Sequence, residues 1–395
     1  MFTMLCIFIH RYRWGFQIRG DERGFYEKAK IYKSRNIKLL VIEREPSIKD
    51  NLEPDTYQSL FIKSGHLPLR NIIDLGLTLY NAFITMLKVK EKPNLVYVYN
   101  QDPENVIVGY LAKLLFRVPM VVVYHHISPS SFETFREGML RRRIAGQSIT
   151  SSIWHSLLPC INRICVKSAN VHLALSYATA QEVKNYLDIQ ECAVIGNGVN
   201  TTTFKNLGLE RKYEGVFLGR LAHQKGIDVL LSAWAEVVKI LPSAQLIIVG
   251  GGDLDSIKQY KNTAASLGLL NSVRFTGFVN DKELVNLLNS AKIFVFPSRK
   301  EGFAQAVSQA MACGLCCILS DIPSLREVYG ETAVYFPCED HLALAHVIVE
   351  YLRDEQLRLK KSKEAEEYVK DMKWSKVVEN ELFYICNGIR KSIVN

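Results

Sequence analysis

Short apolar segments of strand length alternate with helical segments along most of the chain, and this alternation restricts the fold more than any other feature. Helical segments such as Glu22–Ser34 and Pro103–Phe116 separate the expected strands of the first half. Uniformly apolar strands separated by helices are typical of a parallel sheet covered on both faces. The expected strands of this half are Leu5–Ile9, Lys38–Ile42, Leu95–Tyr99, Met120–Tyr124, Val171–Leu175 and Ala193–Ile195.

The alternation starts again after Gly196–Arg211, a stretch with little periodicity. Helices are expected at Ile227–Ile240 and Ala304–Ala312, and a helical tail runs from Asp340 to Lys391. We therefore predict an α/β protein with two doubly wound parallel sheets. The expected strands of this half are Gly215–Leu218, Gln245–Val249, Ser272–Phe275, Ile293–Phe296 and Cys316–Leu319.

The excess positive charge lies entirely in the first half of the chain. Residues 1–190 contain 25 Lys and Arg against 16 Asp and Glu, whereas the remaining residues contain 24 of each. A basic domain beside a neutral one indicates an anionic partner, either a phosphorylated acceptor or an acidic membrane surface. No nucleic-acid recognition module accompanies the charge, so nucleic acid is not expected as a partner.

The apolar runs and the cysteines indicate a cytoplasmic protein. No apolar run reaches the roughly 18 residues of a membrane-spanning helix, and Met1–His10 lacks the basic start and cleavage site of a signal peptide. The nine cysteines are typical of reduced, buried thiols. Cys313, Cys316 and Cys317 form a cluster for which core packing is favoured over zinc, because no second ligand pair has compatible spacing.

Two loops that follow expected strands carry candidate binding groups. In the first, Gly219 permits a close turn, and Arg220 and Lys225 project five residues apart ahead of a helix. Cations beside a helix N-terminus suit a diphosphate, the alternative being an ordinary solvated helix start. In the second, Glu301 can accept hydrogen bonds from sugar hydroxyls, and the free amides of Gly302–Ala304 can hold an anion.

These loops belong to an ordered series of motifs that resembles the family 4 retaining glycosyltransferases (glycosyl transferases group 1). The resemblance is dense over residues 190–335 and mainly architectural over residues 1–190. It implies the GT-B fold, in which two Rossmann-like domains face an interdomain cleft. The motifs are Asn197–Asn200, Gly219–Gly226, Gly250–Gly252, Phe275–Val279, Pro297–Phe303, Ala310–Gly314 and Ser320–Pro323.

The resemblance implies a domain division and a set of site residues. Residues 1–195 would bind the acceptor, residues 196–372 would bind the nucleotide sugar, and the helix at 373–395 would cross back onto the N-terminal domain. Arg220 and Lys225 would neutralise the donor diphosphate, while Glu301 and His125 would approach the transferred sugar. For His125 the alternative is a hydrogen-bonded histidine at a strand end. The remaining donor-binding residues would be Gly20, Gly219, Gly252, Val279, Gly302, Phe303, Ala304 and Gln309.

Two positions depart from the family pattern. The second glutamate of the E-x7-E motif, which binds the nucleotide ribose in the family, is Gln309 here. A glutamine can donate to and accept from hydroxyls, but without the strength that charge gives a hydrogen bond. The N-terminal glycine pair is reduced to Gly20, which Arg19 precedes.

Taken together, the residues and the resemblance predict a retaining hexosyltransferase. It would use a UDP- or GDP-sugar, a glycan, glycolipid or lipid-phosphate acceptor, and no cofactor or obligatory metal. Asp253-Leu254-Asp255 is interpreted as a helix cap rather than a metal motif. The alternatives are a degenerate nucleotide-sugar-binding protein and a sugar-nucleotide epimerase.

Peripheral contact with an anionic membrane, at its inner face, is a further expectation. It depends on the basic residues Arg141–Arg143 and on the apolar helix face between Ile153 and Cys165. For that helix face, packing into the core is the favoured alternative.

Overall fold

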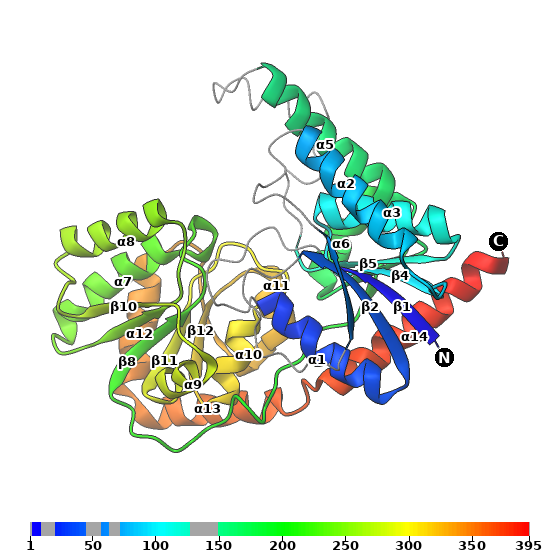
Figure 1. Cartoon of the computed structure of the whole chain (residues 1–395). Coiled ribbons are helices and arrows are strands. Elements are labelled where there is room, and N and C mark those ends of the chain that lie inside the picture. Colours follow the sequence, from blue (N-terminus) through cyan, green and yellow to red (C-terminus); the bar gives the residue numbers. More distant parts are fainter. Residues whose placement is uncertain (1, 9–19, 45–56, 63–71, 127–148, 395) are drawn as a thin grey trace. The chain divides into compact units, whose positions relative to one another are not determined.

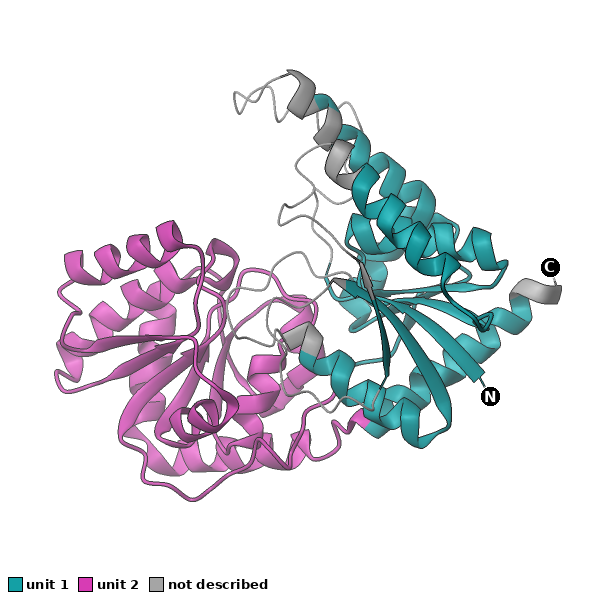
Figure 2. Ribbon diagram, in the orientation of Figure 1, with its two compact units in different colours: residues 1–196, 375–395 teal, residues 197–374 magenta. Residues whose placement is uncertain are grey.

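The computed structural model describes residues 2–8, 20–44, 57–62, 72–126 and 149–394 (Figure 1). The chain divides into two compact units (Figure 2). Unit 1 comprises Met1–Gly196 together with Ser375–Asn395, and unit 2 comprises Asn197–Trp374. Each unit contains one sheet in which all neighbouring strands are parallel.

Unit 1 is built on a seven-stranded sheet in the order β3-β2-β1-β4-β5-β6-β7. Its strands are β1 (Phe2–Ile7), β2 (Ile37–Arg44), β3 (Gln58–Ile62), β4 (Leu95–Val98), β5 (Met120–Tyr124), β6 (Val171–Ala174) and β7 (Ala193–Val194). Its described helices are α1 (Gly20–Ser34), α2 (Ile72–Leu87), α3 (Pro103–Phe116), α5 (Ile149–Lys167), α6 (Tyr177–Leu187) and most of α14 (Trp374–Val394).

Unit 2 is built on a six-stranded sheet in the order β10-β9-β8-β11-β12-β13. Its strands are β8 (Tyr213–Leu218), β9 (Leu246–Val249), β10 (Val273–Gly277), β11 (Ala291–Phe296), β12 (Cys316–Ser320) and β13 (Val334–Phe336). Its helices are α7 (Ile227–Ile240), α8 (Leu254–Ser266), α9 (Asp281–Asn289), α10 (Gln305–Ala312), α11 (Pro323–Tyr329), α12 (His341–Arg353) and α13 (Glu355–Val369).

The strand order reverses direction once in each sheet. The reversal lies between β1 and β4 in unit 1 and between β8 and β11 in unit 2. Ligands of doubly wound folds bind at such a reversal, beyond the carboxyl ends of the strands. The sheets therefore mark one candidate edge in each unit.

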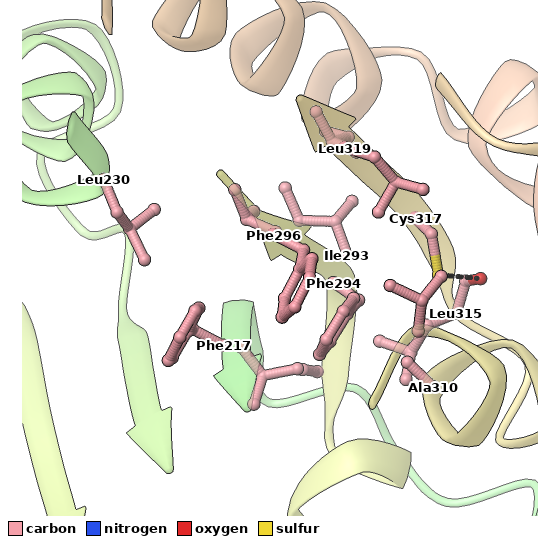
Figure 3. Packing of buried hydrophobic residues seen from close by; sticks show 14 of the residues in the cluster. Phe217, Leu230, Ile293, Phe294, Phe296, Ala310, Leu315, Cys317 and Leu319 are labelled. Atoms are coloured by element: carbon pink, nitrogen blue, oxygen red, sulfur yellow. Dashed lines mark hydrogen bonds between the residues drawn. The ribbon is translucent and has the colours of Figure 1, made fainter. Parts of the chain in front are cut away.

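The core of unit 2 shows why its strands are apolar on both faces (Figure 3). The rings of Phe217 and Phe296 stack with centroids 6.0 Å apart, and Phe294 stacks on Phe296 at 5.9 Å. The thiols of Cys313, Cys316 and Cys317 are fully buried in the same core. Burial raises the pKa of Cys316 to about 12. The prediction that this cysteine cluster packs in the core is confirmed.

The two-sheet α/β architecture is as predicted, but several elements differ from the sequence analysis. The strand expected from Leu5 begins at Phe2, and the single helical tail is three helices, α12, α13 and α14. The sequence patterns did not predict β3, α2 or β13. β3 contains polar residues and β13 is only three residues long, while α2 buries threonines and exposes leucines and aromatic residues, which is the reverse of the usual pattern of a half-buried helix.

Candidate active site

Two loops of unit 2 meet where its strand order reverses. One follows β8 and leads through His223–Lys225 to α7, and the other follows β11 and leads to α10. At Gly226, φ is +67°, and a Cβ atom would lie 2.0 Å from the carbonyl oxygen of Pro297. Only glycine satisfies both conditions, so Gly226 allows the two loops to touch.

A partly buried ion pair joins the two loops. Lys225 Nζ lies 2.6 Å from Glu301 Oε1, and their side chains are 19% and 8% exposed. The Ser298 hydroxyl donates to the same carboxylate oxygen, and the Lys225 ammonium lies 5.2 Å from the centroid of the Phe296 ring. These contacts hold the Glu301 carboxylate in one orientation at the reversal point. Lys225 and Glu301 were predicted from the sequence as site residues, whereas Ser298 was not.

Backbone and amide hydrogen bonds reinforce the contact between the loops. The Gln224 carbonyl accepts from the Arg299 backbone amide at 2.8 Å. The Gln224 side chain in turn donates to the Lys300 carbonyl at 2.6 Å. The segment that carries Glu301 is thus attached to the segment that carries Lys225 at several points.

Arg299 adds an ion pair that sequence reasoning did not anticipate. Its guanidinium makes two hydrogen bonds to Asp228, of 2.9 and 2.7 Å, and its Nε lies 2.7 Å from Glu339 Oε1. Burial opposes ionisation of Asp228, but the Arg299 hydrogen bonds outweigh it and lower the pKa of that carboxyl. No spacing rule links position 299 to position 228, so only the packing of the loops shows the pair.

The N-terminus of α10 lies directly after Glu301. The amides of Gly302, Phe303 and Ala304 donate to no group within the described ranges. The Tyr329 hydroxyl donates to the Ala304 carbonyl at 2.6 Å and orders this turn. Free amides at the start of a helix are suitable donors for an anion.

The glycine loop after β9 lies against the loop after β8. Gly250 has φ of +129°, and a Cβ atom there would lie 2.0 Å from the Gly219 carbonyl oxygen. Gly252 ends this loop, and the Asp253 side chain then accepts from the Ser256 amide at 2.8 Å and caps α8. The interpretation of Asp253 as a helix cap is confirmed.

The other donor-site candidates of unit 2 make fewer side-chain contacts than Lys225 and Glu301. Arg220 follows β8, is exposed, and has no ion-pair partner in the part of the chain that the structure describes. Gln309 is 6% exposed on α10, and its side-chain amide makes no hydrogen bond to a described residue. Val279 follows β10 and packs against the core. Arg220 is therefore accessible to a ligand, whereas Gln309 is largely enclosed.

Two candidates lie in unit 1. Gly20 is the first residue of α1, and His125 directly follows β5. The Nε2 atom of His125 lies 2.9 Å from the Tyr99 carbonyl oxygen, and its backbone amide donates to Gln101 at 3.2 Å. Because a carbonyl only accepts, Nε2 carries a proton, and a neutral ring then has its lone pair on Nδ1. His125 is thus a hydrogen-bonded strand-end histidine; this geometry does not test its predicted role at the sugar.

No three metal-ligating side chains of the described residues converge on one point. Arg141–Arg143 lie outside the described residues. The candidate groups near the reversal point of unit 2 are two cations and helix-terminal donors for an anion, and a fixed carboxylate for hydroxyl groups. They belong to Lys225, Arg220, the free α10 amides and Glu301.

Comparison with known proteins matches both halves of the chain to family models. Residues 18–203 match the model described as Glycosyltransferase Family 4, and residues 199–369 match the model described as Glycosyl transferases group 1. The curated relatives include phosphatidyl-myo-inositol mannosyltransferase from Mycolicibacterium smegmatis, which is 32% identical over 46% of this chain and 48% of its own length.

Another relative aligns over a longer part of the chain. The UDP-Gal:alpha-D-GlcNAc-diphosphoundecaprenol alpha-1,3-galactosyltransferase of Escherichia coli is 26% identical over 77% of both chains. The phosphatidyl-myo-inositol mannosyltransferase of Mycobacterium leprae is 33% identical over half of this chain and 54% of its own length. The chain thus spans about half the length of the two mannosyltransferases.

Solved structures share the fold of the chain. Sucrose-phosphate synthase from Thermosynechococcus elongatus superposes with a TM-score of 0.80 at 18% identity, covering 99% of this chain and 100% of the other. Anabaena HepE in complex with UDP-glucose gives 0.75 at 19% identity, covering 98% of this chain and 100% of the other. At these identities the likeness shows the fold alone, which is the predicted GT-B fold.

Proposed function

Because the chain belongs to glycosyltransferase family 4, we propose that it transfers a hexosyl unit from a UDP- or GDP-sugar to a hydroxyl group of a glycan or glycolipid, with retention of the anomeric configuration. The observation that supports this most is the Lys225–Glu301 pair beside the free amides of α10, at the point where the strand order of unit 2 reverses. The pair joins a diphosphate-binding cation to a sugar-binding carboxylate.

The proposed reaction breaks the bond between the anomeric carbon and the diphosphate oxygen. Negative charge then develops on that oxygen, and Arg220 and Lys225 stabilise it together with the α10 amides. The acceptor hydroxyl attacks from the same face and passes its proton to the departing phosphate oxygen. This route retains the configuration and requires no separate protein base.

Donor binding would rearrange the polar groups of the site. Lys225 has further N–H donors beyond the one directed at Glu301, and these can reach a phosphate oxygen. Glu301 would accept from hydroxyls of the sugar, and Gln309 would hydrogen-bond the nucleotide ribose. Gly20, Gly219, Gly252 and Gly302 would allow close approach of the donor, and His125 would contact the sugar from unit 1.

The proposal includes no obligatory metal, because Arg220 and Lys225 carry the charge that neutralises the diphosphate. It also assigns the acceptor to unit 1, whose sequence carries the positive charge excess. A lipid-phosphate or glycolipid acceptor fits this charge, and one relative bears a name that specifies a diphosphoundecaprenol-linked acceptor. We place the enzyme in the cytoplasm at the inner membrane face.

The test begins with calorimetric titration of UDP, GDP, ADP and their hexose conjugates, followed by transfer assays with the nucleotide that binds. Lys225→Met should lower kcat/KM about 10²–10³-fold, because one donor to the developing charge is removed. Lys292→Met is the matched control. Lys292 pairs with Glu214 at 3.0 Å at the opposite edge of the same sheet, so this change should leave transfer intact.

Three results would contradict the proposal. Equal effects of Lys225→Met and Lys292→Met would remove Lys225 from the site. A changed free nucleotide sugar formed without acceptor would identify an epimerase instead. Binding of a nucleotide sugar without turnover of any glycan or glycolipid acceptor would favour the binding-protein alternative. Gln309→Glu, which restores the glutamate of the family motif, would then be the first variant to make.

A further inference from the structure

Helix α2 presents apolar side chains to solvent. Leu77, Tyr80, Phe83 and Leu87 are 54%, 63%, 42% and 58% exposed, and their spacing of three, three and four residues places them on one face. The opposite face is buried through residues such as Ala82 and Met86. The buried face also contains Thr78 and Thr85, so the exposed face of α2 is the more apolar of the two, and no described segment covers it.

The neighbouring helices continue this apolar surface. Helix α3 packs against both α2 and α5, and Figure 1 shows the three side by side in unit 1. On α5, Ile153, Leu157 and Ile164 are 43%, 40% and 68% exposed and share one face, whereas Leu158 and Cys165 are buried. The apolar positions of this helix therefore divide between the core, as favoured from the sequence, and an exposed outer stripe.

The outer surface of these helices contains almost no negative charge. α5 has no Asp or Glu, α3 has only the fully buried Glu104, and α2 has only Asp74 in its first turn. The three helices connect successive parallel strands and so run in the same direction. Exposed cations follow their C-terminal ends: Lys88, Lys90 and Lys92 after α2, Arg117 after α3, and Lys167 at the end of α5.

We propose that the outer face of α2, α3 and α5 docks on an anionic lipid bilayer. The apolar side chains would enter the boundary between headgroups and acyl chains, where Tyr80 suits the interface, and the lysines would meet the lipid phosphates. A second protein surface is less well matched, since a protein partner would have to supply a patch that is both apolar and acidic. None of the described helices is long and apolar enough to span a bilayer.

This inference rests on the proposed function, because it brings unit 1 to the surface where a lipid-linked acceptor would lie. The test is cosedimentation of the full chain with vesicles of phosphatidylcholine, alone and mixed with phosphatidylglycerol. We expect binding to the mixed vesicles only. The double variant Tyr80→Ser/Leu87→Ser should lower the partition coefficient about tenfold or more, because two inserted side chains are lost.

Charge is tested separately from apolar contact. Replacement of Lys88, Lys90 and Lys92 by Gln should lower partitioning about fivefold for each lysine removed, and added salt should reproduce much of this loss. The matched control is Leu254→Ser/Leu270→Ser. These leucines are 81% and 70% exposed on unit 2, and their replacement should leave vesicle binding unchanged.

Two outcomes would overturn the inference: a wild-type chain that stays in the supernatant with the mixed vesicles, or equal losses in the α2 variant and the unit 2 control. A dimer in sedimentation equilibrium that Tyr80→Ser/Leu87→Ser dissociates would also overturn it, because the face would then join two copies. Nucleotide binding and transfer to a soluble acceptor are measured on the same variants. If transfer fails while vesicle binding is intact, only the proposed function is contradicted. If transfer is intact while the chain does not bind vesicles, only the docking surface is contradicted.

Discussion

Units 1 and 2 have the same strand order over six strands, to which unit 1 adds a seventh, but they place their charged residues differently. In unit 2 the ion pairs Lys225–Glu301 and Arg299–Asp228 lie at the carboxyl edge of the sheet, in two loops and the first turn of α7. Among the described residues of unit 1 the most buried ion pair, Lys28–Glu381, lies between helices α1 and α14, and the outer helices are apolar and basic. The shared fold therefore does not determine the task of a unit. The loops of unit 2 suit a small anion, and the helices of unit 1 suit a large surface.

The buried network of unit 1 attaches the last helix of the chain to the rest of its unit. Glu381 of α14 is 0% exposed, and its Oε1 atom lies 3.1 Å from the Lys28 ammonium. The hydroxyls of Tyr32 and Tyr97 both donate to the same carboxylate. Burial and the nearby Glu381 charge raise the pKa of both tyrosines, so they remain donors. One carboxylate of α14 thus joins α1 and β4.

Glu381→Ala should cause the largest change and should act on unit 1. It leaves the Lys28 charge buried without its partner, which costs about 3–5 kcal/mol of unfolding free energy. Urea denaturation measures the loss. The control is the exposed ion pair between Glu191 and Lys391, of which Lys391 lies on α14. Glu191→Ala should lower the unfolding free energy by less than about 1 kcal/mol. Similar losses for both variants would show that the buried network has no special role.

Unit 1 should also be the acid-sensitive half. Burial, with a smaller contribution from Lys113, lowers the pKa of His172 to about 4. Between pH 6.5 and 4 the unfolded chain binds a proton that the folded chain does not. The free energy of unfolding therefore decreases as the pH is lowered through this range, by up to about 3 kcal/mol. His172→Gln should flatten this decline, whereas His346→Gln, an exposed position on α12 of unit 2, should not. If the unfolding free energies of wild type and H172Q decline equally between pH 6.5 and 4, His172 is not the cause of the acid sensitivity.

Much of the fold follows from local pattern, and the exceptions have physical causes. Strands such as β5 and β12 are buried along their whole length, so apolar runs identify them. Helix α2 has the reverse of the usual pattern, because its outer face is apolar whereas its buried face contains Thr78 and Thr85. The attachment of α14 through Glu381 depends on residues more than 280 positions apart, and no local pattern reports such a pairing.

The candidate site divides in the same way. Lys225, Glu301 and the α10 amides lie in ordered motifs with glycines beside them, so the sequence indicates them. Ser298, Gln224 and Arg299 act by holding one loop against another, and their partners become evident only when β8 and β11 are paired. Sequence motifs therefore identify residues that contact a ligand more readily than residues that hold the contacting side chains in position.

Substitution of a glycine tests how tightly the loops of unit 2 are joined. Gly226 and Gly268 have φ of +67° and +72°, so alanine at either costs about 1 kcal/mol from the backbone alone. Gly268 has open space around it, whereas a Cβ atom at Gly226 meets the Pro297 carbonyl at 2.0 Å. Gly226→Ala should therefore cost about 2 kcal/mol or more and abolish diphosphate binding, as measured by denaturation and calorimetry. Equal losses of unfolding free energy in the two variants would mean that the backbone at Pro297 moves away from the new Cβ atom at little cost.

The smallest expected effect separates positioning from simple ion pairing within unit 2. Arg299→Met removes the hydrogen bonds to Asp228 and Glu339 and should raise the donor Kd about fivefold, or about 1 kcal/mol, because the Glu301 loop loses its anchor. Arg326 pairs with Asp321 in a similar two-bond geometry but lies outside the two loops, and its guanidinium stacks on Tyr335. Arg326→Met should leave the donor Kd unchanged while lowering stability by a comparable amount. Arg299→Lys should restore part of the affinity, since a lysine can keep one of the two contacts to Asp228. If donor affinity instead follows stability in all three variants, Arg299 acts only through the fold.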